Sequence, residues 1–243
     1  AAWFHARKTG QPFVLRIDDI DPLRDDAAAK SSFPHVLSAH GLTWDGDIIY
    51  QSQRYALYRE ALAQLPHFAC ACSRKQISLR GGVHGPDCHG MTDPSARRLQ
   101  PSDSSAYCDL IAGPQAATHL DAPVLWRRDD HPSYHLACAV DEIDLQIACV
   151  IRGDDLLDST PIHRTLIEAL GSEAPAYGHL PVVRADNGQK LSKQNHAPAI
   201  DPAQWHANLC LVLSRLIPGH SPEGTSADAV LAHALPYFEL ERL

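Results

Sequence analysis

The residues from Phe13 to Ile17 form an apolar run that passes directly into a cluster of acidic residues. Its apolar and β-branched side chains predict a strand that is buried in a parallel sheet. Pro22 would end this strand. Asp18 would then lie at the carboxyl end of the strand, where open α/β sheets bind ligands. The run therefore predicts an α/β fold and places a carboxylate where a substrate ammonium could bind. The alternative is that Asp18, Asp19 and Asp21 only cap a turn and pair with Arg16 or Arg24.

A second informative segment is the stretch 190–196, which reads Lys-Leu-Ser-Lys-Gln-Asn-His. The two ammonium groups of Lys190 and Lys193 can neutralise charge that develops on a polyphosphate, and Ser192 can add a hydrogen bond. Gly188 favours a loop at this point. A solvated surface loop would have the same composition, so the segment alone leaves both interpretations open.

Further segments follow in a fixed order, and together they resemble the class I aminoacyl-tRNA synthetases. The resemblance is strongest to the glutamyl-Q tRNA(Asp) synthetase branch of the glutamyl-tRNA synthetase-like family, and it covers residues 1 to about 200. The matching segments are RIDDIDPLR (16–24), GLTWDGD (41–47), QSQR (51–54), YHLACAVDE (134–142), VIRGDDL (150–156), STPIH (159–163) and KLSKQNHA (190–197). The QSQR and KLSKQNHA forms favour the glutamyl-Q branch over ordinary glutamyl-tRNA synthetases.

The resemblance implies a set of site residues. Asp18, which replaces a family Glu, would contact the α-ammonium of glutamate. Tyr134 and Arg152 would bind the rest of the amino acid, with the Arg152 guanidinium pairing with its side-chain carboxylate. Arg152 could instead cap a strand and pair with the acidic residues that follow it. The residues implied for ATP are Lys190 and Lys193 as catalytic groups, and Ser192 and Lys193 as ATP contacts.

The activity implied by the resemblance is a ligase reaction. Glutamate would be activated by ATP, with Mg²⁺ accompanying the nucleotide, and then transferred to the queuosine base of tRNA(Asp). Two alternatives remain open at this point. One is a glutamyl-tRNA synthetase core that charges a tRNA 3′ end, and the other is a non-catalytic, zinc-stabilised RNA-binding paralogue.

Four residues have a spacing that suits a metal ion. They form a C-x-C pair followed by H-x-x-x-C, and they are Cys70, Cys72, His84 and Cys88. Three thiolates and one imidazole can build a closed tetrahedral zinc site of the structural type. The alternative is a set of free thiols. Fallback ligands would be His67, Asp87 and His89. The resemblance supports zinc, since glutamyl-Q enzymes carry it with a Tyr in the place of His84.

Composition fits a cytoplasmic protein with no membrane partner and no DNA partner. No stretch approaches the ~20 apolar residues of a membrane-spanning helix, and seven cysteines, an odd number, fit a reducing compartment. The net charge of −8 is unusual for a protein that binds nucleic acid. Contacts with tRNA would therefore rest on a local basic cluster, made of Arg74, Lys75, Arg80, Arg97 and Arg98.

The expected architecture is a Rossmann-type class I catalytic domain over residues 1–200, with a zinc-bearing insert at 66–120. Apolar spacing from Trp205 to Leu216 and again over 226–235 predicts a short helical region, 201–243, without an anticodon-binding domain. The chain carries no APSPTGxLHxGS-like segment and does not begin with Met. We therefore expect an N-terminally truncated member that lacks its first strand and is inactive as it stands.

Three predictions concern individual elements. Ser52 is expected to cap the helix that contains Tyr55 and Leu65. Thr160 is expected to cap the helix that begins at Pro161. The alternation from Ile143 to Ile147 predicts a strand.

Overall fold

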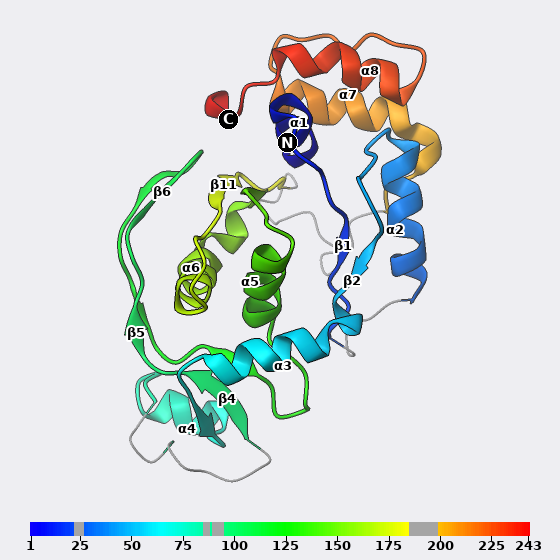
Figure 1. Ribbon diagram of the computed structural model, residues 1–243. Coiled ribbons are helices and arrows are strands. Elements are labelled where there is room, and N and C mark those ends of the chain that lie inside the picture. Colours follow the sequence, from blue (N-terminus) through cyan, green and yellow to red (C-terminus); the bar gives the residue numbers. More distant parts are fainter. Residues whose placement is uncertain (22–26, 85–87, 89–94, 185–198) are drawn as a thin grey trace.

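The structure is a computed structural model that describes residues 1–21, 27–84, 88, 95–184 and 199–243 (Figure 1). Helices and strands are mixed along the chain, in agreement with the predicted α/β class. Figure 1 shows the C-terminal helices beside the N-terminal helix at one end of the molecule, and a small antiparallel sheet at the other.

Two pairs of parallel strands lie between these ends. The first pair is β1 (Arg16–Ile17) and β2 (Ile49–Tyr50), with α2 (Ala27–Ala39) between them in sequence. The second pair is β10 (Cys149–Gly153) and β11 (Ala176–Leu180), separated by the 3-10 helix η3 (Asp154–Ser159) and by α6 (Thr160–Ala169). Parallel neighbours need a crossover connection of this kind, so each pair forms a βαβ unit.

The strand predicted at residues 13–17 is shorter than expected, because only Arg16 and Ile17 are in regular strand geometry. The backbone pairing nevertheless begins earlier. The N–H of Asp45 donates to the Phe13 carbonyl at 2.7 Å, and the N–H of Ile49 donates to the Leu15 carbonyl at 3.0 Å. The apolar run therefore does lead the acidic residues to the end of a paired strand.

The main hydrophobic core lies among α3 (Tyr55–Gln64), α5 (Tyr134–Asp144) and α6. Tyr58, Leu136 and Leu166 are fully buried in it. Tyr58 and Leu65 both face this core.

The QSQR segment joins three motifs that are far apart in the sequence. Gln51 Nε2 and Arg54 Nε donate to the buried carboxylate of Asp141 on α5, at 2.9 and 2.8 Å. The backbone N–H and the hydroxyl of Ser52 donate to Asp19, at 2.8 and 2.7 Å. Ser52 lies in the 3-10 helix η1 (Gln51–Gln53), so the prediction that it caps α3 is wrong. Its hydroxyl instead fixes the acidic turn after β1.

Two other local predictions are wrong. Thr160 does not cap α6; Ser159 occupies the N-cap position, and the Thr160 side chain points to Arg152 and His179. The strand expected from Ile143 to Ile147 is the end of α5 and a tight turn, in which Gln146 has a positive φ of 52°. The helix α5 extends to Asp144 because its side chains are buried in the core. The burial of a helical face therefore determined the local structure, and the alternation of apolar residues did not.

Residues 67–126 contain an antiparallel part. Its three-stranded sheet consists of β3 (His67–Cys70), β4 (Ala96–Leu99) and β9 (Val124–Trp126), with α4 (Arg74–Leu79) beside it. Two further strand pairs are β5 (Ser102–Asp103) with β8 (His119–Leu120), and β6 (Tyr107–Asp109) with β7 (Gly113–Gln115). The last pair reaches back to the parallel strands, where the Leu110 N–H donates to the Tyr177 carbonyl at 2.8 Å.

The C-terminal region packs on α1 (Ala2–Thr9) and contains α7 (Trp205–Leu216) and α8 (Ala227–Ala234), as predicted from apolar spacing. Its 3-10 helices are η5 (Pro202–Gln204), η6 (Leu235–Tyr237) and η7 (Leu240–Arg242). Phe4 and Phe238 stack with ring centroids 5.3 Å apart. Among the described residues, the helices are all too short or too polar to span a bilayer.

Candidate functional site

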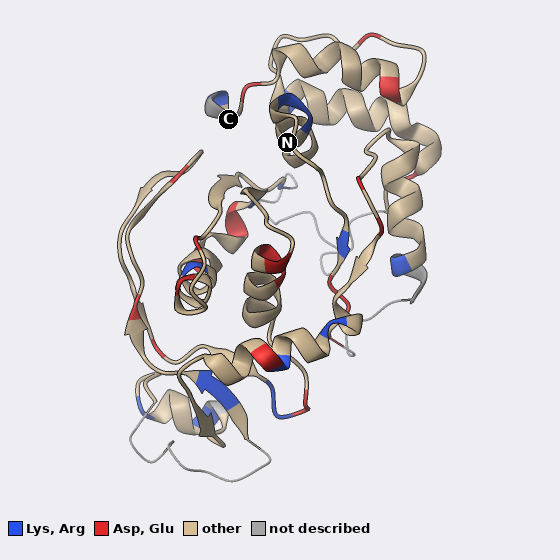
Figure 2. Ribbon diagram, in the orientation of Figure 1, with Lys and Arg blue, Asp and Glu red and all other residues tan. Residues whose placement is uncertain are grey.

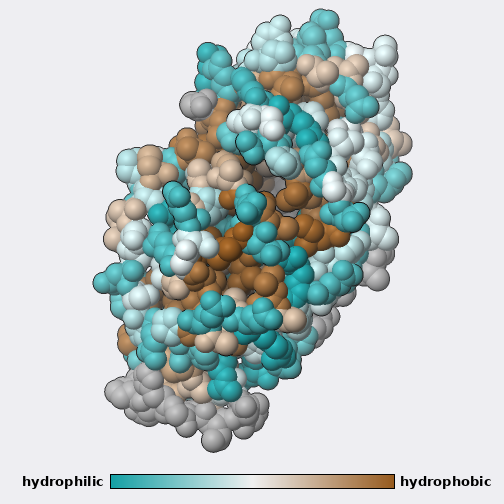
Figure 3. Space-filling view, viewed as in Figure 1, coloured by the Kyte–Doolittle hydropathy of each residue, from teal (hydrophilic) through white to brown (hydrophobic). Residues whose placement is uncertain are grey.

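A cavity of about 710 Å³ lies between the first parallel unit and the second. Its walls come from α1, from the segment that leads into β1, from α5 and from β10. Asp18, Tyr134 and Arg152, the three residues predicted to contact glutamate, all line it. In Figure 3 apolar side chains gather near the middle of the face shown, with polar side chains around them. A mostly apolar pocket with a few charged groups is the usual form of a small-molecule site.

Secondary structure brings these three residues together. Asp18 follows β1, Arg152 lies in β10, and Tyr134 is the first residue of α5, which Ser133 caps by accepting from the Leu136 N–H. The carboxyl ends of parallel strands therefore meet the amino-terminal end of a helix.

The Arg152 guanidinium is held along two of its edges. Nη2 donates to the Thr160 hydroxyl at 2.7 Å, and Nε donates to His179 Nε2 at 3.1 Å. Within the part of the chain that the structure describes, Nη1 has only long contacts, 3.4 Å to His163 Nδ1 and 3.5 Å to the Tyr134 hydroxyl. The Nη1 end beside Tyr134 is therefore the part of the guanidinium that can still bind a carboxylate.

Asp18 combines the two roles considered from the sequence. It lines the cavity, and it also forms a two-point ion pair with Arg16, at 2.7 and 3.2 Å. Arg16 itself lines the cavity and donates to the Cys138 thiol at 3.2 Å. The other two acidic residues of the segment pair elsewhere, Asp19 with Lys30 at 3.1 Å and Asp21 with Arg127 at 3.4 Å.

A second group of buried polar side chains lies behind Arg152, and sequence reasoning did not find it. The Tyr177 hydroxyl donates to Glu142 at 2.6 Å, and His163 lies 3.8 Å from the same carboxylate. Burial acts to raise the pKa of Glu142, but the contacts with His163 and Tyr177 outweigh it and leave that pKa lowered. Burial lowers the pKa of His135, which lies against His163, to about 4. The ring of His135 is therefore neutral at physiological pH.

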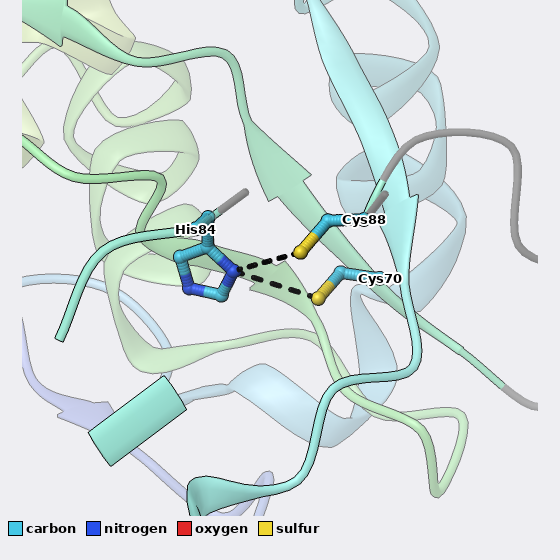
Figure 4. Close-up of side chains that lie close together, drawn as sticks. All are labelled: Cys70, His84 and Cys88. Atoms are coloured by element: carbon cyan, nitrogen blue, oxygen red, sulfur yellow. Dashed lines mark hydrogen bonds between the residues drawn. The ribbon is translucent and has the colours of Figure 1, made fainter. Parts of the chain in front are cut away.

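The cysteine and histidine side chains also come together, as Figure 4 shows. His84 Nδ1 lies 3.6 Å from Cys70 Sγ and 3.7 Å from Cys88 Sγ. Zn–S and Zn–N bonds of about 2.3 and 2.0 Å place tetrahedral S and N ligands about 3.5 Å apart, which these distances match. Cys72 Sγ lies 3.1 Å from Cys88 Sγ, so the fourth predicted ligand borders the same cluster.

The protonation of His84 suits a metal ligand, whereas the contact with Cys88, together with burial, raises the pKa of Cys72 to about 11 in the absence of a metal. Burial lowers the pKa of His84, and the nearby charge of Arg98 lowers it further, which keeps the imidazole neutral as a ligand must be. Cys70 sits at the end of β3, and the backbone of Cys72 accepts from Arg128 Nη2 at 2.5 Å. Of the fallback ligands, His67 is held by the Leu65 carbonyl at 2.8 Å, while Asp87 and His89 lie outside the described residues.

Lys190, Ser192 and Lys193 also lie outside the described residues. Their assignment therefore depends on the sequence alone. β11, which ends at Leu180, precedes them in the chain and adjoins Arg152 through its residue His179.

These features define a class of protein. A family model described as "tRNA synthetases class I (E and Q), catalytic domain" matches residues 1–78 and 92–208, so the chain belongs to this family of ligases. Within it, similar curated proteins are named glutamyl-Q tRNA(Asp) synthetase, which confirms the predicted branch. The protein of Shewanella oneidensis is 36% identical over 98% of this chain and 83% of its own length. That of Neisseria gonorrhoeae is 34% identical over 100% of this chain and 90% of its own.

Solved structures confirm the fold. A glutamate tRNA ligase from Elizabethkingia meningosepticum, in complex with its amino acid, superimposes with a TM-score of 0.77 at 20% sequence identity. The match covers 100% of this chain and 61% of that protein, so this chain spans less than two thirds of it.

Proposed function

We propose that the intact protein activates glutamate with ATP and transfers it to the queuosine base of tRNA(Asp). The observation that carries the proposal is the pairing of opposite charges in one cavity, with Arg152 on one wall and Asp18 on another. Such a cavity suits a zwitterion that has a second carboxylate. The names of the similar curated proteins support the choice of tRNA(Asp).

In the proposed reaction, the side-chain carboxylate of glutamate binds Arg152 Nη1 and the Tyr134 hydroxyl, and its α-ammonium binds Asp18. The α-carboxylate then attacks the α-phosphorus of ATP, which arrives with Mg²⁺, to give glutamyl-adenylate and pyrophosphate. No general base is needed, because a carboxylate is already a nucleophile at neutral pH. Lys190 and Lys193 stabilise the charge on the phosphates, and Ser192 adds a hydrogen bond.

Glutamate-dependent exchange of pyrophosphate into ATP, measured on the full-length protein, tests the first step. Glutamate should support the exchange, and aspartate and glutamine should not, because aspartate is one methylene shorter and glutamine lacks the second negative charge. Equal exchange with glutamine would contradict the role given to Arg152.

The transfer step is tested with two preparations of tRNA(Asp), one with queuosine and one without it. Labelled glutamate should be incorporated only when the modified base is present. Incorporation into both preparations would instead favour the rival function, which is charging of a tRNA 3′ end.

We also propose that Cys70, Cys72, His84 and Cys88 hold one structural Zn²⁺. The match of the S···N distances to a tetrahedral site supports Cys70, His84 and Cys88 as ligands, and Cys72 borders them through Cys88. The ion would cross-link β3 to the segment that contains His84 and Cys88, and it takes no part in the reaction. Metal analysis of C70S and C88S should show a loss of zinc, whereas C210S, on α7, should retain it. Unchanged zinc in C70S and C88S would refute the ligand set.

The same end of the molecule is the proposed contact for RNA. Figure 2 shows basic residues on β4 and α4, although the chain as a whole is acidic. Arg97 lies on β4, and it offers a local positive charge to a phosphate backbone. Charge reversal at Arg97 should weaken tRNA binding and leave amino-acid activation unchanged.

A further inference from the structure

Asp109 and His179 form a fully buried pair directly behind Arg152. The side chains of both residues are 0% exposed, and His179 Nδ1 lies 2.6 Å from Asp109 Oδ2. Asp109 comes from the end of β6, inside the antiparallel part of the chain, whereas His179 lies in β11. The β6–β7 pair therefore contributes a charged group to the back of the amino-acid cavity.

The contacts of Asp109 fix the position of its carboxylate. Oδ1 accepts three backbone N–H groups, from Ala112 at 2.8 Å and from Ile111 and His179 at 3.0 Å. Burial acts to raise the pKa of Asp109, but these hydrogen bonds and that of His179 outweigh it and lower the pKa. The group is therefore an ionised carboxylate, which can only accept hydrogen bonds.

An acceptor at Oδ2 determines which nitrogen of His179 carries the proton. Nδ1 must donate to Asp109, so in the neutral ring Nε2 has a free lone pair. That lone pair faces Arg152 Nε at 3.1 Å and the Thr160 hydroxyl at 3.0 Å. Arg152 Nε is a donor in every state, so only this tautomer of His179 can bind it.

We propose that Asp109 is a positioning residue for the amino-acid pocket, acting through His179 to orient the Arg152 guanidinium. With Nε held by His179 and Nη2 by Thr160, the Nη1 edge is directed to the substrate carboxylate. This inference rests on the proposed function of Arg152, and it assigns to the β6–β7 pair a role in binding glutamate.

The variant that tests the proposal is Asp109→Asn. The amide oxygen can keep the three backbone hydrogen bonds at Oδ1, while the amide NH₂ replaces the acceptor at Oδ2. His179 would then carry its proton on Nε2, where it opposes the N–H of Arg152. We expect the KM for glutamate in pyrophosphate exchange to rise about tenfold or more, with the KM for ATP unchanged.

The matched control is Asp103→Asn. Asp103 also pairs with a histidine, His119, at 2.8 Å, but the two side chains are 80% and 65% exposed. This variant should have the KM values of the wild type. A second variant, His179→Gln, should raise the KM for glutamate as D109N does. The double variant should be no worse than either single one, because both remove the same support of Arg152.

A direct measurement covers the case in which D109N does not fold. Long-range ¹H–¹⁵N spectra of the wild-type protein, with H179Q to assign the signal, should show His179 protonated at Nδ1 and not at Nε2. Protonation at Nε2 would overturn the proposal even if D109N were defective. A wild-type KM for glutamate in D109N would also overturn it, as would equal increases in the KM values for glutamate and ATP. If wild-type protein shows no glutamate-dependent exchange, it is the proposed function that fails, and the spectra still decide the tautomer.

Discussion

The Thr160 hydroxyl accepts a hydrogen bond from Arg152 Nη2 at 2.7 Å and lies 3.0 Å from His179 Nε2. Thr160 follows directly after η3 and is the first residue of α6. The start of this helix therefore fixes the position of the Nη2 edge of the Arg152 guanidinium. Because the residue is fully buried, no water can replace its hydroxyl.

Replacement of Thr160 by Val should therefore raise the KM for glutamate. Valine has the same shape but leaves the donor of Arg152 unpaired, which should also cost about 1–3 kcal/mol of unfolding free energy. Thr160→Ser retains the hydroxyl and should restore the KM. Equal KM values for the valine and serine variants would mean that the hydroxyl does not orient Arg152.

Because of the hydrogen bond from Tyr177 to Glu142, the unfolding free energy of the protein should decrease at acidic pH. The folded pKa of Glu142 lies below its ordinary value of 4.5, so its contribution to stability is fully present above that value. The contribution is lost as the pH falls through the lower, folded pKa. Tyr177→Phe removes one cause of the shift, so it should lower the unfolding free energy by about 1–3 kcal/mol at neutral pH.

This difference between the wild type and Y177F should shrink as the pH falls below 4.5, the ordinary pKa of Glu142. Denaturant unfolding at a series of pH values measures it. Tyr237→Phe is the control, since Tyr237 is 56% exposed and its loss should change little at any pH. A difference for Y177F that did not vary with pH would show that Glu142 keeps its pKa without the tyrosine.

Removal of the proposed zinc ion should destabilise the protein, because few apolar side chains of the described residues pack around the cluster. The local core consists of Phe68, Ala122 and three cysteines, with Ile77 packed against it. We expect chelation to lower the melting temperature by roughly 5 °C or more, since 1 kcal/mol corresponds to about 2–4 °C in a chain of this size. The C70S variant, which we expect to lack the metal, should show no further decrease. A wild-type melting curve that chelators did not alter would argue against a structural ion.

The sequence allowed the pocket to be predicted only where its residues belong to ordered motifs. Tyr134 and Arg152 could be placed together because each falls in a segment that resembles the family, and they do line one cavity. His179 and Asp109 were not found, because they are 70 residues apart and each resembles an ordinary residue of a strand or turn. Thr160 was misassigned as a cap, because a Thr before Pro is typical of a helix start. The Thr160 hydroxyl instead accepts a hydrogen bond from the half-buried guanidinium of Arg152.

Arg152→Lys is the most direct test of the pocket. A lysine ammonium is a single point of charge, so it cannot bind His179 and Thr160 and still present a free edge to a carboxylate. We expect the KM for glutamate to rise by about 10- to 100-fold, with little change in the KM for ATP. Arg59→Lys is the control, since its ion pair with Asp130 at 2.9 Å is exposed, and exposed pairs contribute little. If R152K and R59K had the same KM for glutamate, the guanidinium of Arg152 would not be the group that recognises the substrate carboxylate.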